Sequence, residues 1–260
     1  MKRLFSFSLL VWLAMLCCMM QIGAKAPALS WYCVRQKAHK QPQIEKDFAF
    51  AEDLNAYFID HLHNDANPEK VVYLTFDAGY ENGNVAKTLD ALKEGGVSAA
   101  FFVLEHLIKA EPGLITRMVK EGHLVCNHTA HHPDLSLASP QRIKEEIDAL
   151  EEAFTALTGK RMARYFRPPE GKFSRDMLQC IKELGYKTVF WSFAYADWDN
   201  NKQPDPQKAM QCVMDNIHNG AVLLLHPTSA TNAEILPRVI AELKAQGYRF
   251  GTLEELCGDF

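Results

Sequence analysis

Residues 71–79 read VVYLTFDAG, an apolar run that ends in an aspartate and a glycine. The run Val71–Phe76 carries no charge and is rich in β-branched and aromatic residues, which is typical of a buried strand. Similar runs recur along the chain, at Ala99–Leu104, His123–Cys126, Tyr165-Phe166, Lys187–Trp191 and Ala221–Leu225. The pattern therefore predicts a series of short buried strands.

Helical patterns lie between these runs. Ser139 and Pro140 have the residue types of an N-cap and a first helical position. Apolar residues then recur on one helical face, at Ile143, Ile147, Leu150, Phe154 and Leu157, and Gly159 follows. Three shorter stretches of the same kind stop at Gly122, Gly185 and Gly247. Strands that alternate with helices predict parallel βα units, and hence an α/β fold.

The composition limits the class of protein. The chain has 260 residues, of which 48% are hydrophobic and 23% charged, so disorder, collagen-like repeats and a multispan membrane protein are excluded. The length suits one large domain with a small extension. The formal net charge of −4 offers no basic field for a nucleic acid. We also expect no stable protein partner.

The N-terminus has the pattern of a secretory signal. Lys2 and Arg3 precede the uncharged apolar run Leu4–Met20, and the small residues Gly23 and Ala24 follow. We interpret residues 1–26 as a signal peptide and expect the protein to be exported to the cell envelope, outside the cytoplasm. An uncleaved membrane anchor is the alternative, since the run is near the lower limit for spanning a bilayer.

Residues 27–70 are polar and mixed, and we interpret them as a lead-in that wraps a main domain at 71–257. Within the lead-in, His61 and His63 follow no predicted strand and are expected at the surface. Five cysteines remain after residue 26 without any CxxC pair, which favours scattered free thiols over a redox pair or a zinc knuckle.

Polar residues follow the predicted strands at equivalent places. They are Asp77, the pair His128 and His132, Arg167, Asp197 and His226. In a βα barrel the carboxyl ends of the strands meet at one rim, where active sites are built. Each residue alone has a structural explanation, such as a turn cap or an ion pair. Their shared position favours a functional site.

The two histidines suggest a metal. His128 and His132 are four residues apart and would lie on one face if the segment were helical. Neutral imidazoles at this spacing can share a divalent ion, typically zinc. A solvated polar loop is the alternative, and His131 is expected to point elsewhere.

Together these residues form a recognisable set of motifs. The segments TFDAG (75–79), HTAHH (128–132), RPPEG (167–171), DW (197–198) and LLLH (223–226) occur in this order. The set resembles the five motifs of the polysaccharide deacetylase family (NodB homology, carbohydrate esterase family 4). The resemblance implies a distorted (β/α) barrel. The longer block TFDAGYENG (75–83) is similar to the branch that acts on N-acetylmuramic acid of peptidoglycan and leads to muramic δ-lactam in the spore cortex.

The resemblance also implies roles for the residues. Asp77 would be the general base, paired with Arg167, and His226 the general acid, oriented by Asp197. His128 and His132 would hold a divalent metal, with zinc expected. Tyr80, Trp198, Pro168 and Gly171 would contact the peptidoglycan glycan strand. Glu170 is expected to be solvated.

One position departs from the family pattern. Ala78 stands where most members have a second acidic metal ligand, which leaves two protein ligands and predicts a weaker metal site. Asn82 and Glu81 are nearby candidates to replace it. Three alternatives stay open: deacetylation of N-acetylglucosamine, deacetylation of chitooligosaccharides, and a pseudoenzyme that only binds glycan. The intact base and acid favour an enzyme, and the first motif favours muramic acid.

Overall fold

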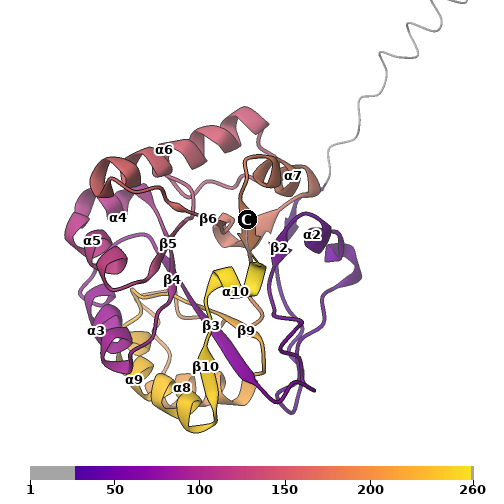
Figure 1. The fold of residues 1–260 in the computed structure, drawn as a ribbon, viewed down its shortest axis with the longest axis vertical. Helices are drawn as coiled ribbons and strands as arrows, with labels where there is room; N and C mark the ends of the chain where they lie inside the picture. The colour runs from indigo at the N-terminus through magenta and orange to yellow at the C-terminus, as the bar shows by residue number, and fades with distance from the viewer. Residues whose placement is uncertain (1–26, 259–260) are drawn as a thin grey trace, which may run out of the picture.

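The computed structural model of the protein describes residues 27–258, so the predicted signal peptide lies outside the described residues. Its centre is a curled eight-stranded sheet with helices packed around the outside (Figure 1). The pairings between the strands of this sheet are parallel. The strands are β2 (Ala56–Tyr57), β3 (Lys70–Ala78), β4 (Ala100–Val103), β5 (Leu124–Asn127), β6 (Ala163–Phe166), β8 (Lys187–Val189), β9 (Ala221–Leu225) and β10 (Tyr248–Phe250). The predicted α/β fold is thereby confirmed.

The sheet closes on itself only loosely, which makes the barrel distorted. β3 is the longest strand and pairs with β10, β9 and β4 along successive parts of its length. On the other side of the ring, β8 ends at Val189. The segment after it contacts β9 through one isolated parallel bridge, between Phe193 and Leu223. The predicted strand Lys187–Trp191 is therefore shorter than expected, because its last residues turn into the loop that carries Asp197.

Helices follow the strands, and four of them lie where the periodicity predicted helices. The outer helices are α3 (Val85–Gly95), α4 (Glu105–Ala110), α5 (Pro112–Lys120), α6 (Pro140–Thr158), α7 (Arg175–Glu183), α8 (Pro206–Asn216) and α9 (Ala230–Ala245), with α10 (Leu253–Cys257) at the end of the described chain. α6 begins as predicted, with the Ser139 hydroxyl accepting from the Arg142 amide, and Gly159 ends it in a left-handed conformation. Ile147 and Leu150 of its apolar face are buried, whereas Leu157 near its end is half-buried. Burial of each such side chain contributes roughly 1.5–3 kcal/mol.

The lead-in is tied to the barrel at several points. It contains β1 (Leu29–Ser30), the 3-10 turn η1 (Lys46–Phe48) and α2 (Phe50–Asp53). β1 pairs with β7 (Lys172–Phe173), which follows the 3-10 turn η2 (Pro169–Gly171). The Trp31 ring stacks on Phe190 at 4.2 Å between centroids. β2, from the same segment, joins the main sheet beside β8. The lead-in thus does more than wrap the barrel, because it supplies a strand of the sheet.

The paired histidines of the lead-in differ in exposure. His61 lies at the surface, as predicted, with its ring at the Glu52 carboxylate. The prediction for His63 is wrong, because its side chain is only 12% exposed and its Nδ1 lies 2.6 Å from the buried Asp60 carboxylate. Asp60 also accepts from the Tyr73 hydroxyl of β3. A buried carboxylate needs such donors, and His63 serves as one of them.

The prediction of scattered free thiols is confirmed. The five cysteines of residues 27–258 are all free. Over the same residues, no helix combines the length and apolar character needed to cross a membrane.

Candidate active site

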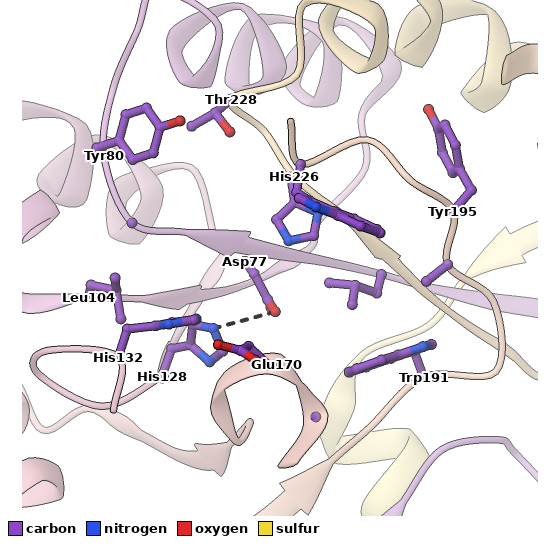
Figure 2. Close-up of a pocket in the computed structure, with 15 residues that line it drawn as sticks. Asp77, Tyr80, Leu104, His128, His132, Glu170, Trp191, Tyr195, His226 and Thr228 are labelled. Atoms are coloured by element: carbon purple, nitrogen blue, oxygen red, sulfur yellow. Dashed lines mark ion pairs between the residues drawn. The ribbon is translucent and has the colours of Figure 1, made fainter. Parts of the chain in front are cut away.

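The carboxyl ends of the strands surround a pocket of about 800 Å³ (Figure 2). Polar residues at the end of β3 and just after β5 and β9 meet in it, as the sequence predicted from their shared position. Its lining includes Asp77, His128, His132 and His226, together with the aromatic side chains of Tyr80, Trp191, Tyr195 and Trp198. Reactive groups and aromatic walls therefore share one cavity, which suits a sugar substrate.

Asp77 forms an ion pair with Arg167 at the floor of the pocket. Arg167 Nη1 lies 2.7 Å from Asp77 Oδ1, and the guanidinium is fully buried. Its other donors reach the Thr75 hydroxyl at 2.8 Å and the Val189 and Phe190 carbonyls at 2.9 and 3.1 Å. These bonds fix the guanidinium, and the guanidinium in turn fixes one carboxylate oxygen of Asp77.

The ion pair also controls the protonation of Asp77. Burial by itself would raise the pKa of this carboxyl group. The positive charge of Arg167, with smaller contributions from His128 and His226, outweighs burial and holds the pKa below its ordinary value. Asp77 is therefore ionised at neutral pH and has a second oxygen available to accept a proton.

His128 is held as a neutral imidazole with one nitrogen facing the pocket. Its Nδ1 lies 2.8 Å from the Arg167 carbonyl oxygen, which can only accept, so the proton is on Nδ1. Burial lowers the pKa of His128 to about 4, against the opposing effect of the Asp77 charge. The unprotonated Nε2 lies 3.5 Å from Asp77 Oδ2, the contact drawn as a dashed line in Figure 2. Such a nitrogen is suited to bind a metal ion.

The loop after β5 brings the second histidine beside the first. The segment is not helical, because Thr129 and His132 have φ angles of 72° and 60°. The prediction that a helix would place the two histidines on one face is therefore wrong, yet the two rings lie 5.0 Å apart between centroids. The turn is closed by the Thr129 hydroxyl, which accepts from the His132 amide at 2.9 Å.

A buried glutamate supports this loop from α6. Glu146 is 1% exposed, and its carboxylate accepts from the His131 amide at 2.9 Å. Glu146 is therefore a buried carboxylate within an otherwise charged stretch of α6. His131 itself lies outside the pocket and pairs with the same carboxylate at 3.1 Å.

The His226 ring is oriented by Asp197. The Nδ1 atom lies 2.7 Å from Asp197 Oδ1, and the backbone amide of His226 donates to Oδ2 at 2.9 Å. Burial would lower the pKa of His226, but the hydrogen bond and charge of Asp197, together with the charge of Asp77, raise it above its ordinary value. Asp197 is 1% exposed, whereas Asp199 faces solvent and caps its own turn.

The predicted substrate contacts are only partly in the pocket. Tyr80, Trp198 and Gly171 line it, and Trp198 is 61% exposed at the rim. Pro168 is buried and is not among the lining residues, and its carbonyl closes the tight turn that ends at Gly171. Gly171 has a φ of 67°, and a Cβ there would come within 2.7 Å of the Trp191 ring.

Glu170 is exposed, as predicted. Its side chain also lines the pocket, which the sequence did not indicate, and Lys172 Nζ lies 2.9 Å from its carboxylate. The backbone of Glu170 has a φ of 55°, an uncommon conformation for a residue with a side chain. In the sequence, this turn is indicated only by the run Pro168-Pro169-Glu170-Gly171.

The replacement candidates for the second acidic ligand point elsewhere. Ala78 is fully buried, Asn82 donates to the Thr228 carbonyl at 2.8 Å, and the Glu81 carboxylate accepts from the amide of Gly83. Within residues 27–258, no group of three or more His, Cys, Asp or Glu side chains is arranged to hold a metal. The two imidazoles of His128 and His132 remain, and their chemistry fits a borderline ion such as zinc.

Comparisons with known proteins agree with this geometry. The polysaccharide deacetylase family model matches residues 64–189. The chain is 39% identical to the peptidoglycan-N-acetylmuramic acid deacetylase PdaA of Bacillus subtilis, over 94% of this chain and 95% of that one.

Solved structures give the same result. The structure of Bacillus subtilis PdaA, a family 4 carbohydrate esterase, superposes with a TM-score of 0.83 at 41% identity, covering 88% of this chain and 96% of that one. A family 4 carbohydrate esterase from Bacillus anthracis superposes with a TM-score of 0.72 at 35% identity, with the same coverage of 88% and 96%. The chain therefore belongs to the polysaccharide deacetylase family, the family 4 carbohydrate esterases with a NodB-type barrel, and is a hydrolase of amide bonds.

Proposed function

We propose that this protein removes the N-acetyl group of N-acetylmuramic acid in peptidoglycan. The observation that carries the proposal is the pairing of two sets of groups in one pocket. An ionised carboxylate, Asp77, is fixed by Arg167, and a histidine of raised pKa, His226, is fixed by Asp197. The similarity to PdaA over nearly the whole chain supports muramic acid as the sugar.

Asp77 is suited to act as the general base. Its ionised carboxylate has one oxygen bound by Arg167, and the other faces His128 across the pocket. This second oxygen would accept the proton of the water that attacks the acetamide carbon. General base catalysis of this kind typically contributes 10²–10⁴-fold to the rate.

The cofactor we propose is a divalent metal ion, with zinc preferred. His128 and His132 would hold it, and it would supply positive charge that polarises the acetamide carbonyl. With two protein ligands in place of the usual three, its affinity should be weaker than that of a typical catalytic zinc site.

His226 is suited to act as the general acid. In its protonated form it would donate a proton to the amine nitrogen as the bond to the acetyl carbon breaks, which releases acetate and the free amino sugar. Asp197 keeps the Nδ1 proton in place, so the proton that is transferred comes from Nε2. The aromatic rim, with Trp198 beside His226 at 6.3 Å between ring centroids, would pack against the sugar ring.

We further propose that the protein acts outside the cytoplasm, at the spore cortex. The signal-like N-terminus and the resemblance of the first motif to the δ-lactam branch support this. The amine produced from muramic acid would then be free to close a lactam with the lactyl carboxyl group of the same sugar.

The test of the proposed function is the digestion of peptide-stripped glycan strands by the purified protein, followed by mass analysis of the fragments. We expect loss of acetyl groups from muramic acid, with or without the loss of water that marks lactam closure. Loss of acetyl groups from glucosamine alone would contradict the muramic acid assignment. Glycan that binds but stays unchanged would favour the pseudoenzyme.

Removal of metal should lower the activity strongly. We expect exhaustive chelation to reduce kcat by about 10²–10³-fold, because several kcal/mol of transition-state stabilisation would be lost. Zinc added back should restore it. The variant His132→Ala should lose this response to zinc, whereas His131→Ala, whose imidazole lies outside the pocket, should keep it. Full deacetylase activity after chelation would show that the metal role of His128 and His132 is wrong.

A further inference from the structure

The buried side-chain amide of Asn232 contacts both Asp197 and the backbone of His226. Asn232 lies in the first turn of α9, is 1% exposed, and donates its backbone amide to the N-cap hydroxyl of Ser229. Its side-chain Nδ2 lies 2.5 Å from Asp197 Oδ2 and 3.0 Å from the His226 carbonyl.

The orientation of this amide is fixed by its neighbours. A carboxylate and a carbonyl can only accept hydrogen bonds, so Nδ2 must face Asp197 and His226. The amide oxygen then points the other way and accepts from the Tyr195 hydroxyl. If the amide were flipped, its oxygen would face the Asp197 carboxylate and the His226 carbonyl, and three acceptors would meet without a donor. The donors therefore run in one direction, from Tyr195 to Asn232 and from Asn232 to Asp197.

The carboxylate of Asp197 depends on this donor for its own orientation. Oδ1 faces His226 Nδ1, while Oδ2 accepts from the His226 backbone amide and from Asn232. The other charged groups that act on His226 are Asp77 and Arg167. Neither of those is hydrogen-bonded to Asp197, so Asn232 is the side chain that holds this carboxylate from behind.

We propose that Asn232 is a positioning residue for the general acid, and that it links the sugar-facing Tyr195 to the Asp197–His226 pair. This inference rests on the proposed function. Tyr195 lines the pocket, so a substrate that packs against its ring contacts the first residue of this series of hydrogen bonds. Asn232 transmits the position of that ring to the carboxylate that orients His226.

The first test compares Asn232→Ala with a matched control from the same turn of α9. Thr231 is also buried and donates its hydroxyl to the Pro204 carbonyl at 2.7 Å, without contacting Asp197. We expect Asn232→Ala to lower kcat about tenfold with KM within twofold, the loss of one oriented hydrogen bond. Thr231→Val should leave kcat unchanged. An Asn232→Ala protein with wild-type kcat and only lowered thermal stability would overturn the proposal.

The second test is a double-mutant cycle with Tyr195→Phe. If Tyr195 acts on the acid through Asn232, its loss lowers kcat in the wild-type chain but adds nothing in the Asn232→Ala chain. Equal effects of Tyr195→Phe on kcat in both chains would overturn the link. The Tyr195→Phe protein also serves on its own if Asn232→Ala does not fold, and wild-type kcat in it would contradict the proposal.

A third measurement separates this inference from the proposed function. The imidazole nitrogen spectrum of the protein, labelled with ¹⁵N-histidine, reports the Nδ1 proton of His226 without any substrate. We expect its Nδ1–H signal to shift and broaden in Asn232→Ala and to stay in place in Thr231→Val. An unchanged signal in both would overturn the positioning role. Failure of the wild-type protein to deacetylate any glycan would overturn the proposed function alone.

Discussion

Asp77→Asn should lower kcat/KM by about 10³-fold or more while the barrel stays folded. The amide keeps the shape of the carboxylate but cannot accept a proton from water, so the contribution of the general base is lost. The ion pair with Arg167 is lost at the same time, although the guanidinium keeps its hydrogen bonds to Thr75, Val189 and Phe190. Initial rates on peptide-stripped glycan, with thermal unfolding of the same samples, measure both effects.

The stability of the Asp77→Asn protein should fall as well. Arg167 is fully buried, and removal of the partner of a buried charge typically costs about 3–5 kcal/mol. The depressed pKa of Asp77 means that this stabilisation is present above the pKa of the unfolded chain, near 4, and is lost as the pH falls through the lower folded value. The variant should therefore be less sensitive to acid than the wild type.

A second buried carboxylate provides the control. Asp60 is 4% exposed and is hydrogen-bonded to Tyr73 and His63, away from the pocket. Asp60→Asn should also lower the stability but leave kcat/KM close to wild type. If Asp77→Asn retained more than a tenth of the activity, or if Asp60→Asn lost as much, Asp77 would not be the base.

Most of the fold was accessible from the sequence because its signals are local. The apolar run Val71–Phe76 forms the core of β3, and the N-cap at Ser139 begins α6 where the pattern placed it. The strand β2 was missed, because two residues of the polar lead-in carry no periodicity. Its place beside β8 is set by pairing with a distant segment.

The reactive residues of the site were also accessible, since each lies at the end of a strand or in the loop that follows one. The supporting residues were not. Glu146 was hidden in a charged helix, and Asn232 lies on α9 where nothing in the local pattern marks it. Which helical position meets a loop depends on how the helix packs on the sheet. Pro168 is likewise buried in the tight turn that ends at Gly171 and is not among the residues that line the pocket.

Asp197→Asn should have the second large effect, on both the rate and its pH dependence. Oδ2 of Asp197 accepts from two donors, the His226 amide and Asn232, so the oxygen of the new amide must face them. Its NH₂ group is then forced toward His226 Nδ1, which can no longer carry a proton there. We expect kcat to fall by about 10²–10⁴-fold, as for other histidines held in the wrong tautomer.

The pH profile distinguishes this effect from a general loss of structure. In the wild type the pKa of His226 is raised, so kcat should hold at neutral pH and decline only as the pH rises through a value above 6.5. The stability that the Asp197–His226 pair contributes follows the same sign: it is full below about pH 6.5 and fades as the pH rises through the folded value. In Asp197→Asn, only the charge of Asp77 would raise the pKa of His226 against the effect of burial. The alkaline decline of kcat should therefore move to lower pH. Asp199 is exposed and lies two residues away, so Asp199→Asn should keep both kcat and its decline at alkaline pH. If the alkaline decline stayed at the same pH in Asp197→Asn, His226 would not be the general acid.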